Sequence, residues 1–214
     1  MLEKDSGMVI VLSGFSGAGK GTIMKHLMSR HPDTYHLSIS ATTRGIRDGE
    51  EDGREYFFKS KESFEQMIAA GELLEYANFN GNYYGTPRAY VQEEIAAGRD
   101  IILEIEVQGA LQVKKIFPEA LLLFVTPPSA EALKDRLLGR GTESEEVVAQ
   151  RLAISARESR LMNEYDYLVI NDKIEDSVAQ VHSIIQSEHN HTSRRREAIA
   201  RIQRELQVFA KGEE

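Results

Sequence analysis

MVIVLSGFSGAGKGT, residues 8–22, is the stretch of sequence that decides the fold of this chain. Its first five residues, 8–12, form a continuous apolar run, which predicts a buried strand. A glycine-rich turn follows at once, and residues 22–30 have the apolar spacing of a helix. The stretch therefore predicts a strand, a loop and a helix in immediate succession.

Residues 14–20 read GFSGAGK and satisfy the pattern G-x-x-x-x-G-K. The glycines let successive backbone N–H groups curl around phosphate oxygens, the helix N-terminus adds partial positive charge, and Lys20 can reach the β- and γ-phosphates. We therefore expect a nucleoside triphosphate at this loop; a glycine-rich turn between core elements is the structural alternative. The residues assigned to this site are Gly14, Phe15, Ser16, Gly17, Ala18, Gly19, Lys20, Gly21 and Thr22.

The loop departs from the strict pattern at Gly21, where serine or threonine is usual. The hydroxyl comes one residue later, at Thr22, which is the candidate contact for Mg²⁺, either directly or through water. By itself the loop indicates a bound triphosphate and leaves the reaction open.

Three further apolar runs predict buried strands at residues 100–106, 120–125 and 167–170, each separated from the next by a helical stretch. Such alternation predicts a parallel sheet covered by helices on both faces. Thr142 followed by Glu145 has the spacing of a capping box and gives one helix a defined start. The predicted helices cover residues 60–70, 87–97, 109–116, 130–138, 145–162 and 174–188.

Residues 36–84 have a different sequence pattern, with short strand candidates at 36–39, 56–58 and 73–76 separated by polar turns. This pattern favours a small mixed-sheet insertion over another strand–helix unit.

The C-terminal stretch from residue 187 is highly charged. Apolar residues recur in it at Ile199, Ile202, Leu206 and Phe209, the spacing of an amphipathic helix. The sequence leaves open whether this added helix packs on its own domain or on a partner.

Composition narrows the class of protein. The chain has 214 residues, enough for one compact α/β domain, and contains no cysteine, so neither a disulfide nor a thiolate metal site can form. A formal charge of −8 disfavours general affinity for nucleic acid or anionic membranes. The apolar run near the start is too short for a signal peptide or a membrane span, so we expect a soluble, cytoplasmic protein.

Arginines gather in two short stretches, and any anion that binds this acidic chain must meet such a local basic site. Solvated surface charge is the alternative explanation. The first group is Arg44, Arg47 and Arg54, and the second is Arg136, Arg140 and Arg151.

Three segments carry a resemblance to a known family: TTRGIRDGEEDGREYFF, NYYGT and GRGTESEE, which begin at residues 42, 82 and 139. With them, the chain resembles guanylate kinases from the phosphate loop to Asn171-Asp172. The resemblance implies an α/β fold of the P-loop NTPase type, in which helices flank a parallel sheet that carries a small mixed α+β GMP-binding insertion and a helical lid. It implies a single domain over residues 1–214, with a core at about 6–35, 87–133 and 153–188, a GMP-binding region at about 36–86, a lid at about 134–152 and a C-terminal helical extension at 189–214.

By this resemblance the substrates are ATP, with Mg²⁺, and GMP, with dGMP as a further acceptor. Glu75 would accept from N1–H and the 2-amino group of guanine and Thr86 would face O6, so that AMP leaves a buried carboxylate unpaired. Arginine forks would grip the phosphate of GMP, and phenol and hydroxyl donors would orient it. The residues implied for that phosphate are Ser40, Arg44, Arg47, Tyr56 and Tyr84. Strand core is the alternative for the two tyrosines, and an exposed strand carboxylate is the alternative for Glu75.

Glu104 and Glu106 end a predicted strand on one face, beside the phosphate loop. Glu106 is assigned to substrate binding, with a catalytic or electrostatic role, and coordination of Mg²⁺ by either glutamate stays open. The resemblance also implies an adenine contact at Asn171, for which a strand-ending turn residue is the alternative. In the implied in-line transfer no protein nucleophile is needed. The catalytic residues are then Lys20, Arg44, Arg136, Arg140 and Arg151.

Other classes of function fit parts of the sequence. An ATPase or GTPase switch would use the same loop but leaves the segments around Arg44 and Tyr84 unexplained. A guanylate-kinase-like interaction module would share the fold, although such modules usually have degraded loop or lid residues. A histidine metal site among His182, His189 and His191 shows no supporting carboxylate pattern. The sequence does not give the oligomeric state, and a homo-oligomer is compatible with it.

Overall fold

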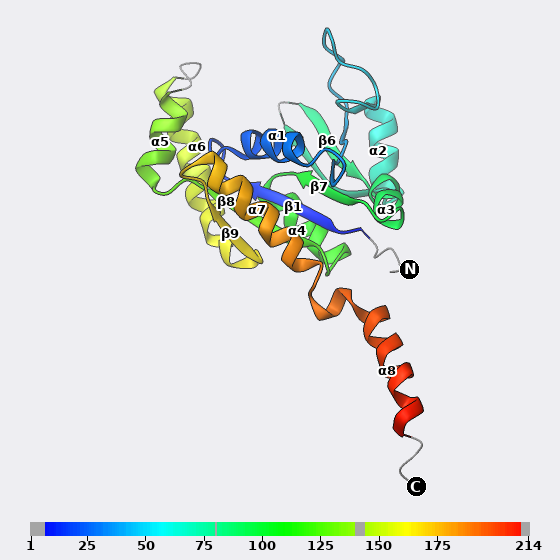
Figure 1. Ribbon diagram of the computed structural model, residues 1–214. Helices are drawn as coiled ribbons and strands as arrows, with labels where there is room; N and C mark the ends of the chain where they lie inside the picture. The colour runs from blue at the N-terminus through cyan, green and yellow to red at the C-terminus, as the bar shows by residue number, and fades with distance from the viewer. Residues whose placement is uncertain (1–6, 80, 140–143, 211–214) are drawn as a thin grey trace.

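The structure is a computed structural model that describes residues 7–79, 81–139 and 144–210. Its central sheet contains five strands: β1 (Val9–Gly14), β2 (Tyr35–Leu37), β7 (Asp100–Glu104), β8 (Leu121–Thr126) and β9 (Tyr167–Ile170). Their spatial order is β2-β7-β1-β8-β9, and all four pairings are parallel (Figure 1). The predicted α/β fold with a parallel sheet is therefore confirmed.

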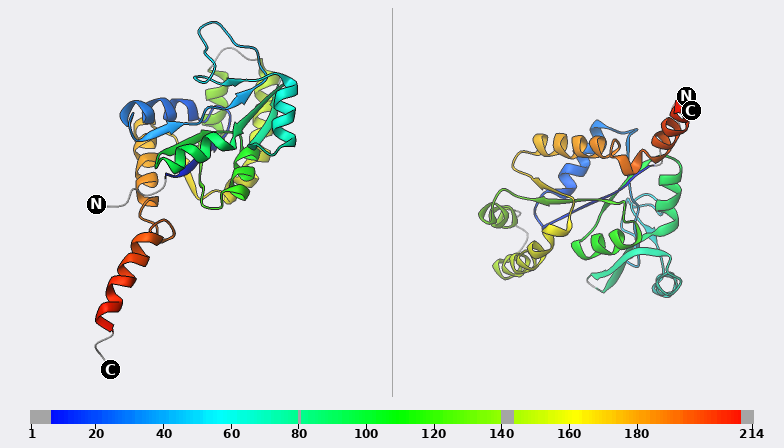
Figure 2. Two further views of the ribbon diagram at one scale, coloured as in Figure 1. Left: turned by 90° about the vertical axis from the view of Figure 1, so that its right-hand side faces the viewer. Right: turned by 90° about the horizontal axis from the view of Figure 1, so that it is seen from below.

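Helices cover both faces of this sheet because its strands are apolar on both sides. Along β1, Ile10 and Leu12 pack into one hydrophobic cluster, whereas Val9 and Val11 pack into another. Helices α1 (Lys20–Arg30) and α7 (Ile174–Glu188) supply the first cluster, and α3 (Arg88–Ala96) and α4 (Val107–Ile116) supply the second (Figure 2). This two-sided burial explains why the strands read as continuous apolar runs instead of alternating ones.

A second, four-stranded sheet has the order β4-β3-β6-β5. Its strands are β3 (Ala41–Thr42), β4 (Phe57–Phe58), β5 (Leu73–Phe79) and β6 (Asn82–Pro87), and α2 (Lys61–Ala69) packs on it through Phe64. The β3–β4 pair is parallel and the other two pairs are antiparallel. The sheet is therefore mixed, as the short strand runs predict.

One strand lies in a different sheet from the predicted one. Residues 36–39 were expected in the insertion, but β2 pairs with β7 in the central sheet, with Tyr35 opposite Asp100. Tyr35 is almost fully buried in the main core, and this anchor holds β2 there. Ser38 still donates its N–H to the carbonyl of Ile102 in the central sheet, at 2.8 Å, and the insertion begins only after it.

Helices α5 (Ala130–Leu138) and α6 (Glu145–Glu158) pack on each other at the C-terminal end of the central strands, and α6 continues into the 3₁₀ turn Ser159–Glu164. The predicted capping residue Thr142 lies outside the described residues. Ser144 is the N-cap of α6 instead, without a capping hydrogen bond from its side chain, and it lowers the pKa of Glu146. No helix in the described ranges is both long and apolar enough to cross a membrane.

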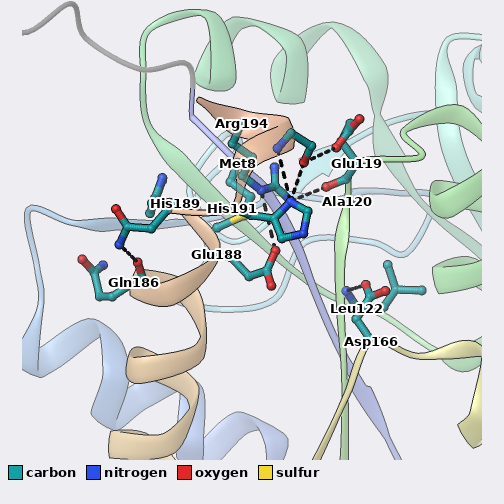
Figure 3. A network of polar contacts seen from close by, with 12 residues as sticks. Met8, Glu119, Ala120, Leu122, Asp166, Gln186, Glu188, His189, His191 and Arg194 are labelled. Atoms are coloured by element: carbon teal, nitrogen blue, oxygen red, sulfur yellow. Dashed lines mark hydrogen bonds and ion pairs between the residues drawn. The ribbon is translucent and has the colours of Figure 1, made fainter. Parts of the chain in front are cut away.

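Helix α8 (Arg196–Ala210) extends away from the domain (Figures 1 and 2). None of its residues is buried, and Leu206 and Phe209 are 58% and 77% exposed. Just before the helix, Arg194 donates to the backbone carbonyl of Glu119, close to His191 (Figure 3). The predicted amphipathic helix is confirmed; its first residue, Arg196, is paired with Glu119 at 3.1 Å, but its apolar side chains stay exposed.

Candidate active site

The loop between β1 and α1 is shaped by close backbone approaches. Gly14 has φ +147°, and a Cβ there would lie 2.0 Å from the carbonyl oxygen of Val125. Gly19 has φ +96°, and a Cβ there would lie 2.4 Å from the side-chain amide of Asn171. Phe15 and Ala18 are buried in the core and anchor the loop from below. Glycine is therefore required at these two positions by both conformation and space.

A cavity of about 330 Å³ opens above this loop, and Lys20, Thr22, Glu104 and Glu106 line it. The ammonium of Lys20 folds back over its own loop and donates to the carbonyl oxygens of Gly14, at 2.7 Å, and of Phe15, at 3.3 Å. The hydroxyl-bearing Thr22 and the two glutamates thus face one space with the lysine. The predicted triphosphate site and the predicted Mg²⁺ contact share this cavity.

Burial raises the pKa of Glu104, while Lys20 lowers it and Glu106 raises it further. Glu158, near the end of α6, also has its pKa raised by burial, and its main electrostatic neighbours are Glu106 and Lys20. Sequence reasoning missed Glu158. The available signal was its position seven residues after Arg151, which places both on one face of a helix.

Asn171 is 5% exposed and lies beneath the loop. Its side-chain amide donates to the carbonyl of Ala18 at 2.8 Å, and its side-chain oxygen accepts from Ser177 at 3.1 Å. Arg136 contacts the same region, donating to the carbonyls of Asn171, at 2.7 Å, and Ala18, at 3.4 Å. In this structure both residues brace the loop from the side, and their predicted contacts with adenine and the phosphates stay predictions.

The remaining lid arginines differ in what the structure describes. Arg151 donates a hydrogen bond to the hydroxyl of Ser16, so α6 reaches directly onto the phosphate loop. Arg140 lies outside the described residues. Two of the three predicted lid arginines are therefore next to the loop.

Three of the five residues predicted for the acceptor phosphate, Arg44, Tyr56 and Tyr84, lie together beside the second sheet. The guanidinium of Arg44 lies 5.3 Å from the ring centre of Tyr56, and the rings of Tyr56 and Tyr84 are 5.9 Å apart. The hydrogen-bonded Glu50 carboxylate is the main cause that raises the pKa of Arg44, and Tyr84 acts in the same direction. Arg47 is exposed on the adjoining turn, and Ser40 directly precedes β3.

Glu75 and Thr86 face each other across β5 and β6. The hydroxyl of Thr86 donates to Glu75 Oε1 at 2.7 Å, and both residues are buried, at 0% and 7% exposure respectively. Burial raises the pKa of Glu75, and its hydrogen bonds with Thr86 partly oppose that shift. A Cβ at Gly109, on α4, would lie 2.8 Å from Glu75 Oε2, so the glycine leaves room for the carboxylate. An exposed strand carboxylate, the alternative for Glu75, is thus wrong.

A parallel sheet with a glycine-rich phosphate loop at the end of its central strand, together with a basic pocket on a second sheet, defines a nucleotide-binding α/β protein of the P-loop class. The family model described as Guanylate kinase matches residues 6–188. The chain belongs to the guanylate kinase family.

Relatives and a solved structure agree with this assignment. A guanylate kinase of Oceanobacillus iheyensis is 53% identical over 186 residues, which cover 87% of this chain and 90% of the relative. One from Streptococcus thermophilus is 51% identical over 185 residues, covering 86% and 88% of the two chains. A crystal structure of guanylate kinase from Anaplasma phagocytophilum is 30% identical, with a TM-score of 0.69, and the match covers 89% of this chain and 90% of that one. The predicted resemblance is confirmed, and α8 lies beyond the matched family model.

Proposed function

We propose that this chain transfers the γ-phosphoryl group of ATP to GMP, giving ADP and GDP. The observation that carries the proposal is the buried Glu75–Thr86 pair beside the cluster of Arg44, Tyr56 and Tyr84. The Glu75 carboxylate presents an acceptor for the N–H edge of guanine, and the cluster of Arg44, Tyr56 and Tyr84 presents donors for a phosphate. Such an acceptor site, added to a triphosphate loop, supports transfer to a nucleoside monophosphate over hydrolysis by water.

Some residues of the ATP site bind the phosphates, and others stabilise the charge of the transferred group. The loop N–H groups and Lys20 hold the β- and γ-phosphates of ATP, and Lys20 gives up its carbonyl contacts at Gly14 and Phe15 to do so. Arg151 and Arg136 stabilise the charge that spreads over the transferred group, and Arg140 joins them in the proposed lid. Arg44 holds the acceptor, so that a phosphate oxygen of GMP attacks in line.

Thr22, Glu104 and Glu106 supply oxygen ligands in the same cavity, the donor type that Mg²⁺ prefers. No group of three or more acidic, histidine or cysteine side chains within the described ranges has the spacing of a metal site, which suits an ion held mainly by substrate phosphates and water. When bound, Mg²⁺ would neutralise charge on the β- and γ-phosphates. Thr22 and the two glutamates would then contact the ion either directly or through water.

The finer assignments belong to the same proposal. The GMP-binding region covers about residues 39–86 once β2 and Ser38 are given to the core, and the lid covers about 134–152. The Glu75–Thr86 pair addresses the base and not the sugar, which supports dGMP as a second acceptor. We place this action in the cytoplasm, and the charge of −8 supports the absence of nucleic acid and anionic lipid as partners. The exposed apolar face of α8 is the surface that a homo-oligomer would use, and sedimentation with and without residues 196–214 tests it.

A coupled assay of ADP release from MgATP tests the function, with GMP, dGMP, AMP, CMP and UMP as acceptors. We expect ADP release with GMP and dGMP only. Equal rates with AMP would contradict the guanine assignment. ADP release without any acceptor would favour an ATPase, and no release with any acceptor would favour an interaction module.

A further inference from the structure

The guanidinium of Arg44 is already held by a carboxylate of its own chain. Its two terminal nitrogens donate to the two oxygens of Glu50, Nη2 to Oε1 at 2.8 Å and Nη1 to Oε2 at 3.0 Å. The two side chains are only 14% and 17% exposed, so this bidentate pair is largely shielded from solvent. Neither the loop motif nor the predicted phosphate ligands account for Glu50.

The contacts of Arg44 with Glu50 and Gly45 leave one edge of its guanidinium for other partners, and Tyr84, itself a predicted phosphate ligand, is a further hydrogen-bond neighbour. Nη1 also donates to the carbonyl of Gly45 at 2.8 Å, so these bonds use three of the five N–H donors of the side chain. The donors that remain are Nε–H and the outer hydrogen of Nη2, which are parallel and form a second fork. Arg44 can therefore grip a phosphate side-on while Glu50 keeps its end-on fork.

Glu50 also fixes the turn that carries the other predicted arginine. Its Oε2 accepts from the backbone N–H of Arg47 at 2.9 Å, and its own N–H donates to the carbonyl of Arg47 at 3.0 Å. Gly49 takes a left-handed conformation, φ +84°, which lets the chain turn back within these residues. The Glu50 carboxylate thus sets the direction of the Arg44 side chain and the position of the Arg47 backbone.

We propose that Glu50 is a positioning residue for the acceptor phosphate: it holds Arg44 by the end-on fork and turns the side-on fork toward the phosphate of GMP. This inference rests on the proposed function, since it deepens the same acceptor site. The arginine is aligned before GMP arrives, which lowers the ordering cost of the phosphate contact. In the opposite role, the Glu50 carboxylate would compete with the phosphate of GMP, which would have to displace it from Arg44. The two roles predict changes of opposite sign when Glu50 loses its charge.

The test compares Glu50→Gln with wild type by calorimetric titration of GMP without ATP, and by steady-state kinetics with both substrates. We expect the Kd and KM for GMP to rise by about tenfold, the size of one lost charged hydrogen bond, and the KM for ATP to stay within about twofold. Glu51→Gln is the matched control, because Glu51 is also paired with an arginine, Arg54 at 3.0 Å, but on the open surface. A general loss of folded protein would lower kcat without this split between the substrates.

A double-mutant cycle asks whether Glu50 acts through Arg44. In an Arg44→Ala background, Glu50→Gln should cause no further loss of GMP affinity. Tighter or unchanged GMP binding by Glu50→Gln would overturn the proposal, the first result by showing competition. If Glu50→Gln does not fold, Glu50→Asp, whose carboxylate is one methylene shorter, replaces it, and wild-type GMP affinity in that variant would likewise overturn the proposal. Activity of the wild-type enzyme with GMP, measured alongside, separates failure of this inference from failure of the proposed function.

Discussion

Replacing Gly109 by alanine tests the guanine pocket without touching any residue that is proposed to bind substrate. Gly109 lies in α4, where alanine ordinarily stabilises a helix by about 1 kcal/mol relative to glycine. The new methyl group, however, would lie 2.8 Å from Glu75 Oε2 and 3.2 Å from its Cδ and Cγ. The far end of a flexible side chain can yield, so we expect Glu75 to move and the protein to stay folded.

The size of the effect follows from the bond that the movement breaks. Glu75 Oε1 is aligned by a 2.7 Å hydrogen bond from Thr86, and a displaced carboxylate keeps neither this bond nor its aim at the guanine N1–H. One lost charge-assisted hydrogen bond corresponds to about 1.5–3 kcal/mol. Since about 1.4 kcal/mol is a factor of ten, kcat/KM for GMP should fall by roughly 10- to 150-fold.

The assay is ADP release with GMP as the varied substrate, combined with thermal unfolding of the same samples. Gln108→Ala is the control, because Gln108 is exposed on the same helix and the change also raises helix propensity. We expect Gly109→Ala to unfold at or above the wild-type temperature while losing GMP activity, and Gln108→Ala to keep both. Wild-type kcat/KM for GMP in Gly109→Ala would refute the placement of Glu75 against the base.

Three further outcomes follow from the site and its surroundings. Arg151→Ala should lower kcat by about 10³-fold with little change in KM for GMP, and near-normal kcat would remove Arg151 from the mechanism. Burial raises the pKa of Glu75 above the ordinary glutamate value of 4.5, so its carboxylate should become protonated before the pH falls to 4.5. KM for GMP should therefore rise as the pH is lowered toward 4.5, and a flat KM profile down to that pH would contradict this. The Asp100 carboxylate, 2.7 Å from the His189 ring, raises the pKa of that histidine above 6.5. The His189–Asp100 pair should therefore stabilise the fold fully below pH 6.5 and lose this contribution as the pH rises through the pKa that His189 has in the folded state. Above that pKa, the melting temperatures of wild type and His189→Gln should converge.

Much of the central domain was predictable because its strands are long enough to show a pattern. The strand at residues 167–170 and the helix at 174–188 were predicted with the bounds that β9 and α7 have in the structure. Continuous apolar runs buried on both faces give a strong signal, as in β1. The glycine-rich loop added a motif whose spacing depends on the backbone itself.

The second sheet was less readable for physical reasons. Its strands β3 and β4 have two residues each, too few to show any period. Nothing in the local sequence of β2 says which sheet it joins, since that depends on Tyr35 reaching the main core.

The helix predicted over residues 145–162 ends at Glu158 and tightens into a 3₁₀ turn, a change in hydrogen bonding that spacing alone does not reveal.

The candidate site shows the same division. The motifs predicted the loop residues, the Arg44 cluster and the Glu75–Thr86 pair, and the structure brings the members of each described group together. Glu50 escaped prediction because a glutamate in a polar turn reads as solvated charge until the fold sets it against an arginine. Asn171 was predicted as an adenine contact, and only its hydrogen bond to the carbonyl of Ala18 reveals that its amide also supports the loop.

The passage from the central sheet to the second sheet is very short, and its length has a mechanical consequence. Ser38 is bonded to Ile102 in one sheet, while the carbonyl of Ser40 already accepts from Phe57 in the other, at 2.9 Å, so Ile39 alone separates the two. The return passage is as short, since β6 ends at Pro87 and α3 begins at Arg88, so any rotation of the second sheet relative to the first must pivot on these two connections. Ser40, the predicted phosphate ligand, thus sits almost on the axis, where displacement is smallest. Because Thr86 lies beside the second connection and Glu75 lies against Gly109 of α4, such a rotation would displace the guanine pocket little as well.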